Sequence, residues 1–149
     1  MSRIYLASSW RNESQPQIVE ILRAAGQEVY DFRNPPRGQS GFGWSEIDPN
    51  WRNWSIDKYW EILLTHPRAK EGFLNDYAGM NWADTCVLLL PSGRSAHLEA
   101  GYMMGQKKRV FILLHQNKFE PELMYLLADI PEYGAIVTSI EELLEELGK

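Results

Sequence analysis

A nearly continuous apolar run at residues 86–90 limits the folds open to this chain more than any other feature of its sequence. A strand with one wet face alternates apolar and polar residues, whereas an unbroken apolar run is typical of a strand covered on both faces. Helices packed on both sides of a parallel sheet provide that environment. Cys86 lies in this run, and we expect it to be a buried strand residue. As the only cysteine, it cannot form an internal disulfide.

Strand-like and helix-like segments alternate along the rest of the chain. Ser14 and Gln17 match a capping box, Pro16 falls in the first turn, and Gly26 follows as a stop signal. The apolar patterns predict strands at 3–7, 27–32, 84–90, 109–115 and 135–138, and helices at 14–25, 56–64, 67–82, 95–106, 120–128 and 139–147. This order predicts a single α/β domain over residues 1–149, a three-layer sandwich around a five-stranded parallel sheet of the flavodoxin or Rossmann type.

Composition and charge exclude several classes of partner. Apolar residues make up 44% of the chain and charged residues 23%, as in ordinary globular proteins. The net charge is −5 and the basic residues are scattered, whereas a nucleic-acid polymer requires a concentrated positive face. No run reaches the roughly 18 apolar residues that would span a membrane, and the N-terminus leads directly into a strand-like segment. We therefore expect a cytoplasmic protein without a nucleic-acid or membrane partner.

The region from about residue 34 to 55 has no clear period and is rich in proline, glycine and aromatic residues. Four of the six tryptophans lie in or just after it, at Trp44, Trp51, Trp54 and Trp60. Long loops in compact domains are usually functional or disordered, and disordered segments are poor in aromatic residues. We therefore predict an ordered, Trp-rich lid, whose indoles could stack on a base.

Ligands of open parallel sheets bind beyond the carboxyl ends of the strands. This rule directs attention to the segments that follow the strands: Ser8, Ser9 and Trp10, the stretch from Arg33 onward, residues 91–99, and residues 115–116. The most informative is 91–99, where a buried strand turns into a helix. The first N–H groups of that helix, with the positive end of its dipole, favour an anion.

Four residues of this turn are candidates for binding a ligand: Gly93, Arg94, Ser95 and His97. The guanidinium of Arg94 suits a phosphate or carboxylate, although a solvated turn residue is nearly as good an explanation. His97 points to a different helix face from Glu99, and we interpret it as structural or ligand-orienting.

Glu99 lies about one turn into the same helix, among small and apolar neighbours that would leave its carboxylate poorly solvated. A plain surface glutamate is the alternative. The N-terminal part of the 67–82 helix should lie near the site, and Asp76 on that helix could reach it. Asp84 should lie at the opposite end of its strand, in a capping or loop-bonding role. Tyr5 could direct its hydroxyl toward the site or be a core tyrosine.

Three segments carry a family resemblance. They are Ile4-Tyr-Leu-Ala-Ser-Ser-Trp10, the pair Asn75-Asp76 eight residues ahead of Asp84, and Gly93-Arg-Ser-Ala-His-Leu-Glu99-Ala-Gly-Tyr-x-x-Gly-x-x-Lys108. Together they resemble the nucleoside 2-deoxyribosyltransferase family and its relatives, the nucleotide N-glycosidases. The likeness extends more weakly over most of the chain.

The resemblance implies an enzyme that breaks the N-glycosidic bond of a nucleoside or nucleoside 5′-monophosphate. Glu99 would attack the anomeric carbon to form a glycosyl-enzyme ester, Tyr5 would orient Glu99, and Asp76 would meet the base and help it leave protonated. A second base or water would then accept the sugar. The resemblance implies no cofactor and no metal, and it implies a homo-oligomer.

The chain also departs from the transferase pattern. Transferases often carry an acidic residue a few positions ahead of the glutamate, where this chain has Gly93-Arg94-Ser95, and this difference suggests a 5′-phosphate. Glu122 and Met124 are candidates for the residues that a chain end or neighbouring subunit places in the transferase site.

Two other classes of function are open at this stage. The first is a non-catalytic nucleotide-sensing module that uses the same pocket, with the aromatic lid signalling to a partner. The second, less favoured, is a flavodoxin-like redox protein that holds a flavin between tryptophans. Substitution of Glu99 separates an enzyme from a sensor, because only an enzyme would lose turnover while still binding its ligand.

Overall fold

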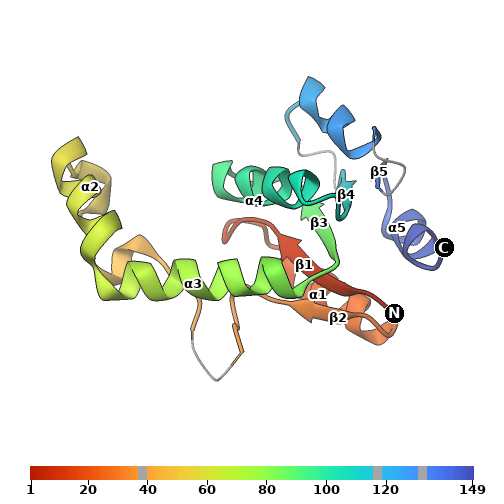
Figure 1. The fold of residues 1–149 in the computed structure, drawn as a ribbon, viewed down its shortest axis with the longest axis horizontal. Helices are drawn as coiled ribbons and strands as arrows, with labels where there is room; N and C mark the ends of the chain where they lie inside the picture. The colour runs from red at the N-terminus through yellow and green to blue at the C-terminus, as the bar shows by residue number, and fades with distance from the viewer. Residues whose placement is uncertain (37–39, 116–118, 131–133) are drawn as a thin grey trace.

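The computed structural model describes residues 1–36, 40–115, 119–130 and 134–149, in which five parallel strands form one sheet in the order β2-β1-β3-β4-β5 (Figure 1). The strands are β1 (Arg3–Ala7), β2 (Glu28–Tyr30), β3 (Thr85–Leu89), β4 (Arg109–Leu113) and β5 (Ala135–Val137). The predicted five-stranded parallel sheet is confirmed, although the four later strands are shorter than expected.

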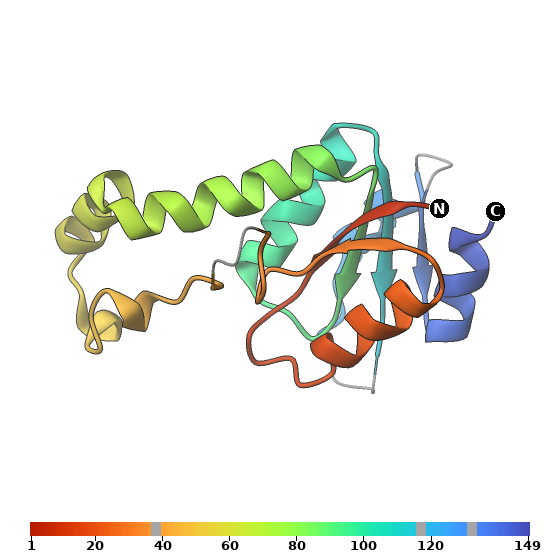
Figure 2. The ribbon, with the colours of Figure 1, turned by 90° about the horizontal axis from the view of Figure 1, so that it is seen from below.

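Helices cover both faces of this sheet (Figure 1, Figure 2). α1 (Gln15–Ala24) and α5 (Ile140–Leu147) pack on one face. α3 (Pro67–Trp82), α4 (Arg94–Gly105) and the 3-10 helix η3 (Leu123–Ala128) pack on the other. The predicted three-layer sandwich is therefore confirmed. None of the helices in the described ranges is long and apolar enough to cross a membrane.

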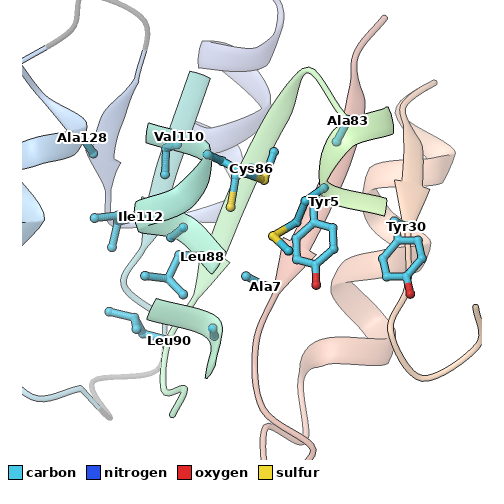
Figure 3. Close-up of a cluster of buried hydrophobic side chains, with 14 residues drawn as sticks. Tyr5, Ala7, Tyr30, Ala83, Cys86, Leu88, Leu90, Val110, Ile112 and Ala128 are labelled. Carbon is cyan, nitrogen blue, oxygen red and sulfur yellow. The ribbon is translucent and has the colours of Figure 1, made fainter. Parts of the chain in front are cut away.

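The alternation of side chains along β1 determines which residues face the site. Ile4 and Leu6 pack against the α1 side, whereas Tyr5 and Ala7 point to the α3 and α4 side (Figure 3). All four are at most 1% exposed. Burial of a large apolar side chain contributes about 1.5–3 kcal/mol, so a one-residue slip of β1 would be costly and Tyr5 is held firmly on the α3 and α4 side.

One part of the molecule, which we call the arm and define as residues 42–73, extends past the sheet. It contains the 3-10 turns η1 (Trp44–Glu46) and η2 (Trp51–Asn53), helix α2 (Ile56–Thr65) and the first part of α3. Figure 2 shows α3 running beyond the strands, with α2 at its far end. Sixteen helical residues span about 24 Å, whereas a five-residue strand spans about 17 Å, so α3 is too long for the sheet.

Aromatic rings pack against one another inside the arm. The ring of Trp44 meets Phe42, Trp54 and Tyr59 edge-on, at centroid distances of 4.9, 5.8 and 5.9 Å. Gly72 permits this packing, because a Cβ there would lie 2.7 Å from Cβ of Phe42. The aromatic rings of the described part of the Trp-rich segment thus pack on one another, and its order and its role as a lid stay predictions.

Three expectations about the helices are wrong. The first part of the 67–82 helix lies in the arm rather than near the sheet edge, for the reason of length given above. Ser14 forms no capping box, since its side chain accepts no cap hydrogen bond and its backbone is already helical; its N–H instead donates to Asn12 Oδ1 at 2.9 Å. Residues 120–128 form only the 3-10 helix η3, because the chain is still extended at Glu122.

Candidate active site

Tyr5 and Glu99 meet in the layer between the sheet and α4. The Tyr5 hydroxyl donates a hydrogen bond of 2.5 Å to Glu99 Oε2. Burial raises the pKa of Glu99 to about 7, the hydrogen bond from Tyr5 opposes this rise, and the charge of Asp76 adds to it. Burial also raises the pKa of Tyr5, so its hydroxyl is a donor at any physiological pH. The glutamate is therefore partly dry and oriented, rather than free in solvent.

A second tyrosine–carboxylate pair lies beside the first. The Tyr30 hydroxyl at the end of β2 donates to Asp76 Oδ1 on α3, at 2.8 Å. Burial raises the pKa of Asp76 to about 6, and the hydrogen bond from Tyr30 works against that rise. The rings of Tyr5 and Tyr30 stack at a centroid distance of 5.2 Å with 7° between their planes. Figure 3 shows the two rings side by side, with their hydroxyls pointing the same way.

Both carboxyl groups have pKa values raised toward neutrality, and the charge of Asp76 contributes to the rise at Glu99. Groups with pKa values in this range can exchange protons at pH 7, which structural surface carboxylates do not. Perturbed carboxyl groups at the ligand edge of a parallel sheet are typical of active sites.

The loop after β1 holds the three residues Ser8, Ser9 and Trp10. Ser8 Oγ donates to the carbonyl of Leu89 at 3.0 Å and so joins the ends of β1 and β3. Ser9 Oγ accepts a hydrogen bond of 3.1 Å from the backbone N–H of Arg11. These bonds shape the loop around the sheet edge.

Trp10 connects this loop to the beginning of the arm. Its indole N–H donates to the carbonyl of Phe42 at 3.1 Å, and its ring meets Phe32 edge-on. The Arg33 guanidinium lies 5.1 Å from the centre of the Trp10 ring and donates to the carbonyls of Trp10 and Asn12, at 2.9 Å each. Trp10 is half exposed, so one part of its ring stays open to a ligand.

The start of α4 carries the other predicted binding residues. Arg94 and Ser95 are exposed, and their side chains make no hydrogen bond or ion pair with any residue that the structure describes. His97 Nδ1 bonds the carbonyl of Gly93 at 2.7 Å, and its Nε2 lies 2.8 Å from the Tyr125 hydroxyl. Because Nδ1 must donate to a carbonyl, the neutral ring accepts from Tyr125 at Nε2. His97 thus joins α4 to η3.

A cavity of about 430 Å³ opens beside this turn. It is lined by Ser9, Arg11, Leu90, Pro91, Ser92, His97, Phe119, Glu120, Glu122 and Tyr125. Glu99 does not line it: His97 faces η3, whereas Glu99 faces β1 on the other side of α4. Ser92 Oγ is buried and finds no hydrogen-bond partner within the described ranges. The start of α4 therefore separates this cavity, on its η3 side, from the Tyr5–Glu99 pair, on its β1 side.

The remaining predicted positions lie as follows. Asp84 sits at the opposite end of its strand and accepts from the backbone N–H of Arg3 at 3.2 Å, which confirms its loop-bonding role. Glu122 caps Met124 N, and Met124 is exposed. Cys86 is buried in β3, as expected. Residue 116 lies outside the described residues. Where the structure is described, no group of three or more His, Cys, Asp or Glu side chains is arranged to hold a metal.

Sequence reasoning missed three residues of this site: Tyr30, Arg11 and Tyr125. The carboxyl-edge rule contained a signal for Tyr30, which ends β2, and for Arg11, which follows the first ligand loop. No pattern in the sequence connects Tyr125 with His97, because they lie on different elements and the pairing depends on how η3 packs.

The five parallel strands in the order β2-β1-β3-β4-β5, with helices on both faces, form an α/β fold of the 2-deoxyribosyltransferase type. A 2-deoxyribosyltransferase from the psychrotolerant bacterium Bacillus psychrosaccharolyticus matches with a TM-score of 0.60 and 19% identity, over 95% of this chain and 89% of that one. A CMP N-glycosidase from Clostridium botulinum matches with a TM-score of 0.52 and 16% identity, over 99% of both chains.

At these identities the likeness establishes the fold, which is the fold implied by the sequence resemblance. No family model and no curated protein sequence matches the chain.

Proposed function

We propose that this protein cleaves the N-glycosidic bond of a nucleoside or nucleoside 5′-monophosphate and transfers the sugar to another base or to water. The observation that carries the proposal is the buried pair of Tyr5 and Glu99, with the carboxyl of Asp76 beside it. The fold shared with a deoxyribosyltransferase and an N-glycosidase supports the same reaction class. Nothing in the proposed chemistry requires a cofactor or a metal.

In the first step, a carboxylate oxygen of Glu99 forms a bond to the anomeric carbon while the bond from that carbon to the base nitrogen breaks. The electron pair of the broken bond goes to the base, which takes a proton from Asp76. The sugar is then held as an ester of Glu99. In the second step, the nitrogen of another base or a water molecule attacks the same carbon, the ester bond breaks, and the proton of the attacking group returns to Asp76.

The reactive form has Glu99 ionised and Asp76 protonated. The Tyr5 hydroxyl favours the ionised state of Glu99, as the Tyr30 hydroxyl favours that of Asp76. With pKa values of about 7 for Glu99 and about 6 for Asp76, the reactive form is therefore a minor one. The partial burial of both carboxyl groups strengthens the attraction between ionised Glu99 and the positive charge that develops on the sugar.

The cavity beside the start of α4 supports a 5′-monophosphate in particular. Arg11 lines the cavity, and a Cβ on Gly93 would lie 3.8 Å from its Nη2, so the guanidinium sits over the start of α4. The buried Ser92 Oγ has a free hydrogen-bonding capacity at the same place. Glu120 and Glu122 line this cavity as well and would oppose a phosphate when ionised. A nucleoside and its 5′-monophosphate should therefore be compared directly.

We also propose a homo-oligomer. The outer surface exposes large apolar side chains on α2, α3 and η3, including Ile56, Trp60, Phe73, Leu123 and Met124. Such side chains are typical of interaction sites where they gather, and α2 and η3 each carry more than one. Met124 and Glu122 lie close to the cavity entrance in sequence and structure, so a second copy packed there would lie near the site.

The test is a panel of ribo- and 2-deoxyribonucleosides and their 5′-monophosphates, with release of free base measured by chromatography. We expect release from at least one compound. Release that needs a second base indicates a transferase, and release without one indicates a hydrolase. A folded protein that binds a member of the panel but releases base from none would instead support the sensing module.

The matched variant is Glu99→Gln, which keeps the size and the hydrogen bond to Tyr5 but removes the nucleophile. We expect kcat to fall by about 10⁴-fold while binding of the substrate changes little, because the covalent step is lost. If the substitution alters only the affinity for the ligand, the proposed enzymatic activity is contradicted and the nucleotide-sensing module is supported.

A further inference from the structure

Tyr30 stands at the end of β2 and takes no part in either step of the proposed reaction. Its hydroxyl nevertheless donates to Asp76 at 2.8 Å, just as the hydroxyl of Tyr5 donates to Glu99. The two rings are stacked almost parallel in the buried core. Each candidate carboxyl group thus has a tyrosine donor of its own, and the two donors are packed against each other.

Helix α3 leaves room for this contact at Gly79. Gly79 lies three residues after Asp76, so the two positions share a face of the helix. A Cβ at Gly79 would lie 2.8 Å from both Cγ and Cδ2 of the Tyr30 ring, which is closer than carbon atoms approach. The absence of a side chain there lets the ring cross the helix and bring its hydroxyl to Asp76.

We propose that Tyr30 is the positioning residue for Asp76: its hydroxyl aims the Asp76 carboxyl at the base, and its stack on Tyr5 fixes that carboxyl relative to Glu99. The inference rests on the proposed function, because Asp76 needs a defined direction only if it gives a proton to a leaving base. A carboxyl held by a buried, rigid ring keeps a single orientation, and small errors in the position of a reacting group reduce rates strongly.

The titratable groups around Asp76 come from five segments: Tyr30 on β2, Tyr5 on β1, Glu99 on α4, Asp31 just after β2 and the buried Cys86 on β3. The pKa of Asp76 is raised by burial and lowered by the hydrogen bond from Tyr30. Loss of the hydroxyl alone therefore moves the pKa of Asp76 further upward, and it does so without changing any charge in the array.

The experiment uses Tyr30→Phe, which preserves the stack on Tyr5 and the fit over Gly79 but removes the donor. At about pH 5, Asp76 is mostly protonated in both proteins, and the ionised fraction of Glu99 is small but the same in both, so the ratio of the two rates reports the orientation of Asp76 rather than its protonation. We expect kcat for base release to fall about tenfold there with KM changed less than twofold. A carbon-13 NMR titration of the aspartate carboxyl groups should show the Asp76 transition at higher pH.

The matched control is Tyr59→Phe in the arm. The Tyr59 hydroxyl has no hydrogen-bond partner in the described structure, so we expect unchanged kcat and an unchanged titration of Asp76. A second variant, Gly79→Ala, displaces the Tyr30 ring rather than removing its hydroxyl. It should lower kcat to a similar extent, and combining it with Tyr30→Phe should add little further loss.

The outcomes separate the two proposals. A folded Tyr30→Phe protein with wild-type kcat and a wild-type Asp76 titration would overturn the role of Tyr30 and leave the proposed function standing. A wild-type protein that releases no base from any compound overturns the proposed function and this role together. If Tyr30→Phe does not fold, Gly79→Ala decides, and wild-type kcat in that variant would count against the inference.

Discussion

The sheet region and the arm (residues 42–73) place their aromatic and apolar side chains in different environments: the sheet region buries them, whereas the arm leaves many of them exposed. In the sheet region, strands such as β3 are buried along their whole length, and two tyrosines are buried with their hydroxyls bonded to carboxyl groups. In the arm, α2 has no buried residue, and its rings pack mainly on one another. The difference indicates that most of the stability comes from the sheet region, which also holds the candidate site, while the arm leaves apolar side chains at the surface, as the proposed homo-oligomer would require.

The strongest way to break this comparison is to remove one leucine from each region. Leu88→Ala in β3, where the side chain is 1% exposed, should lower the free energy of unfolding by about 3 kcal/mol, because it leaves a cavity. Leu63→Ala in α2, where the side chain is 39% exposed, should cost less than about 1 kcal/mol in the monomer. Urea titrations at low protein concentration measure the unfolding free energy of both variants. Equal losses of unfolding free energy would contradict the proposed difference between the sheet region and the arm.

A second test uses pH. In the folded protein the pKa of Glu99 is about 7 and that of Asp76 about 6, against ordinary values of 4.5 and 3.8. Between these limits the folded protein binds more protons than the unfolded chain, so stability is greatest at acidic pH and declines as the pH rises. We expect a loss of up to about 4 kcal/mol between about pH 5 and pH 8.

Two substitutions locate the origin of that pH dependence. Glu99→Gln should flatten the decline and make the protein more stable than wild type at about pH 8, since no buried charge then forms. Glu61→Gln, at an exposed position of the arm, should leave the decline unchanged. Denaturant midpoints across the pH range are the measurement, and a stability that increases from pH 5 to pH 8 would contradict the buried state of Glu99.

The smallest effect is expected at Trp60, which is 60% exposed on α2. Trp60→Ser should change the unfolding free energy of the monomer by less than about 0.5 kcal/mol, because little of the ring is buried. The same change should reduce self-association in sedimentation experiments, since loss of a large apolar side chain weakens an interface. If the wild-type protein is a monomer in these experiments, the proposal that this surface forms a homo-oligomer is wrong.

The fold was predictable because burial determines it. The apolar run in β3 and the spacing of strands and helices indicated a parallel sheet covered on both faces, and the carboxyl-edge rule placed Glu99 and Tyr5 in the same region. Local signals were weaker guides. Ser14 does not cap its helix, and its N–H donates to the side chain of Asn12 instead. The direction of the arm follows from α3, which is longer than the strands it packs on.

The partner of Asp76 was beyond the reach of sequence patterns for a different reason. Tyr30 lies 46 residues before Asp76. The contact between them depends on the space that Gly79 on α3 leaves for the Tyr30 ring. A single sequence contains no periodic signal for such a contact. The same is true of Tyr125 and His97, which are 28 residues apart.

The hydrogen bond between Tyr5 and Glu99 joins residues 94 positions apart, one on β1 and the other on α4, which is made much later during synthesis. Because β1 lies between β2 and β3, that first strand must wait for a neighbour made much later before its hydroxyl has an acceptor. A nascent or truncated chain that lacks α4 therefore has no Tyr5–Glu99 pair. If the proposed function is right, a partly made protein would have no activity.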